Sequence, residues 1–317
     1  MASFTTLAGT KGKPGHTDNL VFEPHGIAQH PTNGDIYVSG DTSLKLIRGG
    51  VVTTVAGKAG EDPSFVLGKG ADARFALCRG ISISPHADSL LLCDCDNHCV
   101  FRAHLETLEV VLVCGVPGIV GGLDGPIATA TFDSPVKAIE TETGELFIVC
   151  ASACTIRRVD TAGNVTTLCG QHGVGGKADG VGSAATLNRP FDIAYVAGSE
   201  SGGSGGGGTL FVADAGNSCV RSVSTVDGTV TTLPGSFTQA NGISAGTTPD
   251  GRLCLYVSDN SSLHCFVNDA TAAGEDNWSQ TTVCRWSAVG MGNGLHSCLS
   301  SDGTRIAVAF RGDHVVG

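Results

Sequence analysis

Short runs of alternating apolar and polar residues, separated by glycine-containing turns, make up most of this chain. The clearest segment is 176–235, where an apolar stretch is followed by three strand-like runs. These four elements are 191–194, 209–214, 219–223 and 229–233. Alternating β-branched residues bounded by Gly, Asn and Asp are typical of strands joined by hairpins. The pattern therefore predicts four antiparallel strands within this one segment.

The predicted fourth strand recurs along the chain with almost the same ending. Each copy ends in glycine, and the five copies are 5–9, 53–57, 111–115, 166–170 and 231–235. Their final glycines lie 48 to 65 residues apart. A roughly regular period in this range indicates one supersecondary unit that is copied along the chain.

The two ends of the chain complement each other in this scheme. Residues 3–9 form a predicted fourth strand with nothing before it, whereas residues 290–317 supply first, second and short third strands without a fourth. We therefore expect an all-β, six-bladed β-propeller of four-stranded antiparallel blades, in which the N-terminal strand completes the last blade. Residues 1–317 then form a single domain, with a flexible Gly/Ser loop at 198–208.

The repeated unit resembles the NHL-repeat family of β-propellers. The resemblance rests on segments 179–190, 210–217 and 230–235, and it extends over essentially the whole chain. At a predicted turn, Asp96-Asn97-His98 is close to the Asn-His element that gives the family its name. The resemblance implies a rigid ring that mostly serves as a platform for proteins, although some members bind RNA or carry enzyme sites.

Composition narrows the classes of partner and compartment. The formal net charge is −11 with only 19 Lys and Arg residues, which disfavours nucleic acid because phosphate binding needs clustered cations. The sequence contains neither an apolar run long enough to span a bilayer nor a signal-peptide pattern, so we expect no membrane partner. The 13 cysteines are then interpreted as reduced, small core residues of a cytoplasmic monomer.

The candidate binding residues follow from the expected ring. The first strand of each propeller blade lines the central channel, so residues at its start are expected at the channel mouth. Aligning the six copies places polar residues there; they are His25, Arg79, Lys137, Asp192, Asn241 and Asn293. Rigid blades that present loops at one rim suit recognition of a protein or peptide. We therefore predict a non-catalytic binding scaffold that uses this mouth and needs no cofactor.

An enzyme is the alternative. Asn241-Gly242 and Asn293-Gly294 are similar to elements of gluconolactonase-like propellers, which implies a metal-dependent hydrolase or lyase. In that case Asn241, Asn293 and Asp192 would hold a divalent metal such as calcium or zinc in the channel. Amidating lyases instead place zinc-binding histidines after a blade proline, as in Pro24-His25, but only one of the six equivalent positions is histidine.

Two further motifs have simpler explanations. The segment 242–246 matches a nucleophile elbow, which needs a strand-to-helix turn, yet Ser244 is predicted to lie in mid-strand. Cys93, Cys95, His98 and Cys99 are ligand types for zinc, but alanine stands at the positions equivalent to Cys93 and Cys95 in another copy. Small packing residues therefore explain this group better than a metal site does.

Overall fold

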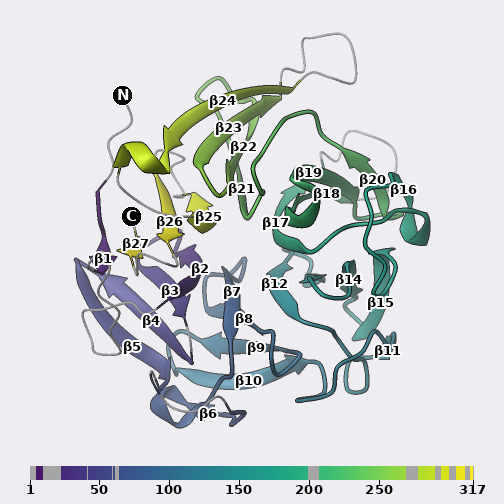
Figure 1. The fold of residues 1–317 in the computed structure, drawn as a ribbon. Coiled ribbons are helices and arrows are strands. Elements are labelled where there is room, and N and C mark those ends of the chain that lie inside the picture. The colour runs from purple at the N-terminus through teal and green to yellow at the C-terminus, as the bar shows by residue number, and fades with distance from the viewer. Residues whose placement is uncertain are drawn as a thin grey trace.

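The computed structural model describes residues 5–9, 23–40, 42–58, 60, 64–198, 207–268, 278–289, 294–299, 305–310 and 315–316. Within these ranges the strands form six sheets set around a common axis (Figure 1). The helical segments among them are short 3-10 turns, namely η1 (Gly70–Asp72), η2 (Gly182–Ala184), η3 (Ala215–Asn217) and η4 (Trp286–Val289). The protein is therefore an all-β propeller.

Five blades are each built from one continuous segment of the chain. Blade 1 consists of β2 (Pro24–Gln29), β3 (Ile36–Gly40), β4 (Ser43–Arg48) and β5 (Val51–Gly57). Blade 2 consists of β6 (Gly68–Lys69), β7 (Cys78–Ile83), β8 (Ser89–Asp94), β9 (Cys99–His104) and β10 (Glu109–Cys114). Blade 3 consists of β11 (Gly125–Pro126), β12 (Pro135–Glu140), β13 (Leu146–Cys150), β14 (Thr155–Val159) and β15 (Asn164–Gly170).

The remaining continuous blades follow in chain order. Blade 4 consists of β16 (Gly180–Val181), β17 (Pro190–Ala197), β18 (Gly208–Asp214), β19 (Cys219–Ser224) and β20 (Thr229–Thr232). Blade 5 consists of β21 (Gly242–Thr247), β22 (Leu253–Ser258), β23 (Ser262–Asn268) and β24 (Trp278–Arg285). The first long strands of neighbouring blades contact one another near the axis, β2 with β7, β7 with β12, β12 with β17 and β17 with β21.

The sixth sheet combines the two ends of the chain. Its order is β1 (Ala8–Gly9), β27 (Val315–Val316), β26 (Ile306–Phe310) and β25 (Gly294–Leu299). Ala8 pairs with Val316, and the Leu7 N–H donates to the Val316 carbonyl at 2.8 Å. Strand β25 contacts both β21 and β2, so this composite sheet lies between blade 5 and blade 1.

The expected fold class, six blades of four strands each, is wrong as stated. The structure has five continuous blades of four or five strands, and a composite sheet that no single segment forms. Blades 2, 3 and 4 gain a fifth strand of two residues, β6, β11 or β16, which pairs with the outermost long strand. These pieces come from the loops that lead into each blade, and they are too short to show a strand period in the sequence.

Apolar side chains fill the space between neighbouring sheets. Tyr37 and Leu44 of blade 1, for example, belong to one buried cluster with Phe101 of blade 2. On the composite sheet, Ala8 and Val316 are buried with residues of blade 1. In β8, Leu90 and Leu92 belong to the cluster shared with blade 1, whereas Leu91 and Cys93 belong to one shared with blade 3, so this sheet buries apolar side chains on both faces.

The cysteines belong to these cores. The side chains of twelve of the 13 cysteines are described; ten of these are buried, and all twelve are free thiols. Burial raises the pKa of Cys95 and of Cys150 to about 12, so both thiols stay protonated at neutral pH. The prediction that cysteines are small core residues is confirmed for this part of the chain.

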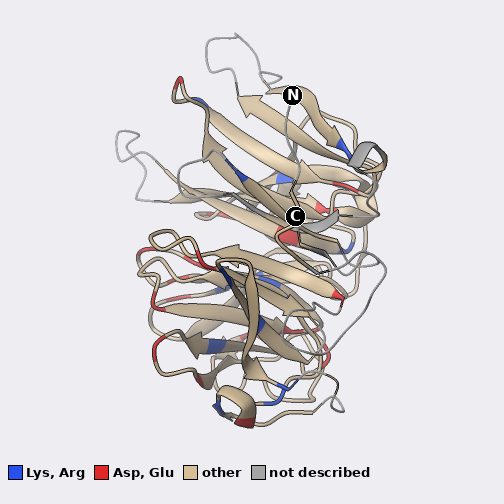
Figure 2. Cartoon of the chain, turned by 90° about the vertical axis from the view of Figure 1, so that its left-hand side faces the viewer, with Lys and Arg blue, Asp and Glu red and all other residues tan. Residues whose placement is uncertain are grey.

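Acidic and basic residues are interspersed over the side of the ring that Figure 2 shows. None of the helical segments described is long and apolar enough to cross a bilayer. Most of the predicted Gly/Ser loop at 198–208 lies outside the described residues.

Candidate functional site

The starts of the first strands occupy equivalent places in the blades. In blades 1, 3 and 4 the pairing register with the second strand shifts by one residue at this start, and afterwards Gly26 pairs with Ser39, Lys137 with Val149 and Asp192 with Ala213. A bulge of this kind re-aims the side chain that follows it. The structure therefore brings three positions that the sequence alignment equated to matching points near the axis.

Neighbouring first strands approach so closely here that two blades need glycine. A Cβ atom on Gly26 would lie 2.5 Å from the carbonyl oxygen of Arg79. A Cβ atom on Gly80 would lie 2.1 Å from the carbonyl oxygen of Val136 and 2.9 Å from Cδ of Lys137. Gly80 thus leaves the space through which the Lys137 side chain passes.

Lys137 and Asp192 form a buried ion pair at this level. The Lys137 ammonium lies 3.5 Å from Oδ1 of Asp192 and donates to the Ile81 carbonyl at 2.8 Å. Asp192 is fully buried, and it accepts the N–H of Ile193 at 2.9 Å and that of Ile243 at 3.0 Å. The pair therefore joins blades 2, 3, 4 and 5 to one another around the axis.

Arg79 is half-buried and reaches across to another blade. Its guanidinium carbon lies 5.7 Å from the ring centroid of Phe191 in blade 4, and its Nε donates to Sγ of Cys95 at 3.3 Å. Arg79 and Phe191 are the equivalent first-strand residues of blades 2 and 4, so their contact passes over blade 3. Among the predicted mouth residues that are described, Arg79 is the one that is not buried.

The other predicted residues are placed as follows. His25 is 1% exposed at the start of β2, and Asn241 is 4% exposed just before β21. The Asn241 amide donates to Oδ1 of Asn260 at 2.8 Å, while Asn260 donates to Gln239. Asn293 lies outside the described residues.

The surroundings of Asp192 do not fit a divalent metal. Both carboxylate oxygens already accept backbone N–H groups, and the Lys137 ammonium would repel a second cation. Among the residues that the structure describes, no group of three or more His, Cys, Asp or Glu side chains is arranged to hold a metal ion. Asn241 offers a metal only an amide oxygen.

Neither of the two discounted motifs gains support from the geometry. Cys93 and Cys95 pack in different apolar clusters, and Nδ1 of His98 accepts the Ser134 N–H at 3.2 Å. Ser244 lies in the middle of strand β21, which continues to Thr247 without a helix. The predicted absence of a strand-to-helix turn at Ser244 is confirmed.

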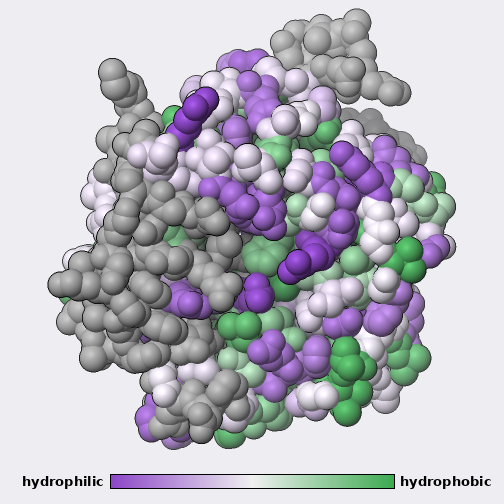
Figure 3. Space-filling view, viewed as in Figure 1, coloured by the Kyte–Doolittle hydropathy of each residue, from purple (hydrophilic) through white to green (hydrophobic). Residues whose placement is uncertain are grey.

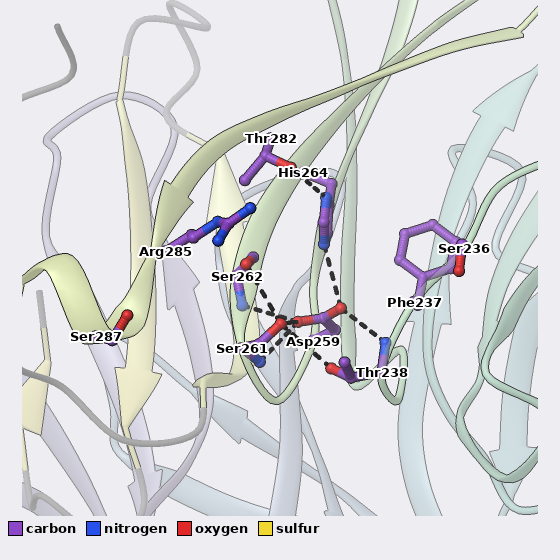
Figure 4. Close-up of a pocket in the computed structure, with 10 residues that line it drawn as sticks. All are labelled: Ser236, Phe237, Thr238, Asp259, Ser261, Ser262, His264, Thr282, Arg285 and Ser287. Atoms are coloured by element: carbon purple, nitrogen blue, oxygen red, sulfur yellow. Dashed lines mark hydrogen bonds and ion pairs between the residues drawn. The ribbon is translucent and has the colours of Figure 1, made fainter.

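A second polar site, which the sequence interpretation missed, lies in blade 5 (Figure 4). It is a cavity of about 440 Å³ lined by Ser236, Phe237, Thr238, Asp259, Ser261, Ser262, His264, Thr282, Arg285 and Ser287. Nε2 of His264 lies 3.1 Å from Oδ2 of Asp259, and its Nδ1 lies 3.2 Å from the Gln280 amide. Burial alone would raise the pKa of Asp259, but His264 and the backbone N–H groups of Thr238 and Ser261 hold it well below its usual value.

The same place in blade 4 is filled by the chain itself. Arg221, which pairs with Thr232, occupies the position that His264 occupies opposite Thr282. Its guanidinium binds Asp214 at 3.0 Å and Asp179 at 2.7 Å, and Asp179 also accepts the N–H and the hydroxyl of Thr232. Asp179 belongs to the segment that leads into blade 4.

Blade 3 repeats this arrangement of arginine, aspartate and threonine. Arg157 binds Asp124 at 2.6 Å, and Asp124 accepts the N–H and hydroxyl of Thr167. The lead segment of blade 4 has 19 residues (171–189), whereas the equivalent segment of blade 5 has four (236–239). The short segment and the exchange of Arg for His264 are both visible in the sequence, but only the structure shows that they leave a cavity.

On the face of the ring seen in Figure 3, hydrophilic and hydrophobic residues both lie around the centre. No protein-family model matches this chain, and no curated protein matches it. Several solved structures are similar to it. A gluconolactonase from Xanthomonas campestris is 13% identical, covers 98% of this chain and 86% of its own, and has a TM-score of 0.61. A second protein provisionally named a gluconolactonase is 11% identical over 96% of this chain and 91% of its own, with a TM-score of 0.57.

An auxiliary nutrient binding protein from Bacteroides thetaiotaomicron is also similar. It is 16% identical, covers 98% of this chain and 74% of its own, and has a TM-score of 0.51. Identities this low establish the fold and nothing finer. The β-propeller expected from the NHL resemblance is confirmed, but membership of the NHL-repeat family is not shown.

Proposed function

We propose that this propeller acts on a small, oxygen-rich molecule at the mouth of its central channel, as a hydrolase or lyase of the gluconolactonase-like type. The depth of the mouth residues carries the proposal, because His25, Lys137, Asp192 and Asn241 are all between 0 and 7% exposed. Side chains at this depth offer little area to a protein surface, whereas the half-buried Arg79 beside them can contact a small molecule in the channel. The likeness to gluconolactonase structures supports the same choice.

Arg79 is the residue that we assign to substrate binding. It is the half-buried cation of the mouth, and a guanidinium can hold a carbonyl or carboxylate oxygen through paired hydrogen bonds. Lys137 and Asp192 hold the first strands in place beneath it. Asp192 is not assigned a metal, because both of its carboxylate oxygens already accept backbone N–H groups.

Hydrolysis of gluconolactone tests this proposal. The rate of acid release is measured with protein purified without chelator, then with added calcium or zinc and with EDTA. We expect hydrolysis above the buffer rate, with kcat/KM reduced about tenfold or more by Arg79→Ala. Lys177→Ala, which changes an exposed cation elsewhere, is the matched control. Rates equal to buffer under every metal condition, over a panel of sugar lactones, would reject the enzyme.

A non-catalytic scaffold that binds a protein or peptide at the mouth is the second candidate. One observation favours it, because Asp192, the acid among the predicted mouth residues, is fully engaged by backbone N–H groups and Lys137. Under this candidate, Arg79→Ala weakens capture of a partner, and no lactone is hydrolysed. A cytoplasmic location and a monomeric state also stay predictions.

A further inference from the structure

Blade 5 has an open outer edge where blades 2, 3 and 4 have a fifth strand. In blades 2, 3 and 4 the outermost long strands, β10, β15 and β20, each pair with a short strand from the lead segment. The equivalent strand β24 pairs with β23, and no other described strand joins it. An unpaired strand edge is a template on which another strand can add.

The geometry of the sibling blades points to the occupant. We propose that the edge of β24 and the adjoining cavity bind an extended peptide of a partner protein that carries an aspartate, in the place that Asp179-Gly180 occupies in blade 4. Gly180 there pairs with Val230, and Asp179 binds the N–H and hydroxyl of Thr232. This binding mode adds a strand to an existing sheet.

The donors that Asp179 uses have counterparts in blade 5. Thr282 stands opposite His264 as Thr232 stands opposite Arg221, so the same register directs its N–H to the outer edge. Arg285, which lies on β24 opposite Ser262, also lines the cavity and supplies a cation to it. Imidazole is shorter than guanidinium, which leaves the cavity of about 440 Å³ beside His264. The site therefore has hydrogen-bond donors for a carboxylate, but the lead segment of blade 5 (236–239) contains no acidic residue.

The occupant is assigned to another protein because the two matching aspartate segments in the described part of the chain are already in use. Asp124 and Asp179 are each bound to an arginine and a threonine of their own blade. A second copy of this chain would have to break those contacts before it could offer either one. This inference is independent of the enzyme proposed for the channel mouth, since the two sites share none of the residues discussed.

The chain supplies both the probe and the reporter for a test. The probe is a synthetic peptide with the sequence of residues 176–187, which contains Asp179 and Gly180. The two tryptophans of the chain are Trp278 and Trp286, one at the start of β24 and the other just after its end. Trp286 donates to the Asp259 carbonyl at 2.7 Å, so its fluorescence reports on the cavity wall.

We expect the peptide to change tryptophan fluorescence saturably and to slow deuterium exchange in residues 279–283 of the full chain. The same peptide with Asp179→Asn should bind about tenfold or more weakly, because it loses the hydrogen bonds of a carboxylate. In the protein, Thr282→Pro removes the outward N–H, which an edge strand tolerates, and should abolish binding. Thr282→Val keeps the N–H and should lose only the contribution of the hydroxyl.

Three results would overturn the inference. The first is that peptide at about 1 mM changes neither the tryptophan fluorescence nor the deuterium exchange of β24, because the dissociation constant would then be weaker than about 1 mM. The second is equal binding of the Asp179→Asn peptide, which requires no mutant protein to fold. The third is slow exchange of the outward-facing Thr282 N–H in the protein alone, because the edge would then already be covered.

Discussion

Lys137 links three blades from one point near the axis. Its stem passes over Gly80 of blade 2, and its ammonium binds the Ile81 carbonyl and Asp192 of blade 4. Because both charges are at most 8% exposed, removal of one leaves the other buried without its partner. The residue therefore serves the architecture of the mouth, and a role in contacting a ligand falls to Arg79.

The first prediction concerns Lys137→Met. This change keeps the length of the stem and removes the charge that neutralises Asp192, so we expect a loss of about 3–5 kcal/mol in the free energy of unfolding. Urea denaturation followed by far-UV circular dichroism measures it. Lys177→Met is the control, since Lys177 is exposed, and it should stay within about 0.5 kcal/mol of the native value. Equal stability of the two variants would show that Lys137 is not a structural ion-pair residue.

At the scale of the blade, one position holds three kinds of side chain in blades 2 to 5. Blades 3 and 4 use Arg157 and Arg221 bound to an aspartate of the lead segment, whereas blade 2 places Phe101 there, stacked on Phe65. Blade 5 has His264 and a cavity. The carboxylates beside this position differ accordingly, because burial raises the pKa of Asp214 whereas hydrogen bonds lower that of Asp259.

The second prediction follows from the opposite shifts of these two carboxylates. The pKa of Asp259 is lower in the folded protein than in the unfolded chain, so its stabilising contribution is complete above about pH 4 and is lost on acidification. Asp259→Asn should therefore flatten the fall in unfolding free energy between about pH 5 and pH 3. The measurement is urea denaturation at several pH values.

Asp214 provides the contrast for that experiment. Its raised pKa means that the folded state binds the proton more tightly, so this residue adds stability as the pH falls. Asp214→Asn should consequently make the unfolding free energy fall more steeply as the pH is lowered, whereas Asp259→Asn should make it fall less steeply. The same change of slope in both variants would contradict the assignment of these shifts.

Much of the element scale could be predicted from the sequence, and the reasons are physical. Strands such as 229–232 consist of β-branched residues next to a glycine turn, so their signal is local in the sequence. The two-residue strands, such as Gly180–Val181, have no period and depend on an outer strand that lies far away in the sequence. The contact of Lys137 with Asp192 depends on the distance between blades, which a single sequence does not encode locally.

At the scale of the whole molecule, the ring depends on a short contact between the chain ends. Strand β1 has only two residues, yet Ala8 is 7% exposed and packs in a cluster that includes Ile27, Val38 and Ala309. The cluster lies between the composite sheet and blade 1. Loss of β1 would uncover apolar side chains there and leave the edge of β27 unpaired.

The third prediction tests this closure with two adjacent residues. Ala8→Asp places a charge in the buried cluster and should lower the free energy of unfolding by at least about 2 kcal/mol. Leu7→Asp alters a side chain that is 37% exposed and should cost only about 0.5 kcal/mol. Deuterium exchange should accelerate in β2 and β26 for Ala8→Asp alone, because these strands share the cluster. If the N-terminal strand were not docked, the two variants would be equally stable and would exchange alike, since neither side chain would then be buried.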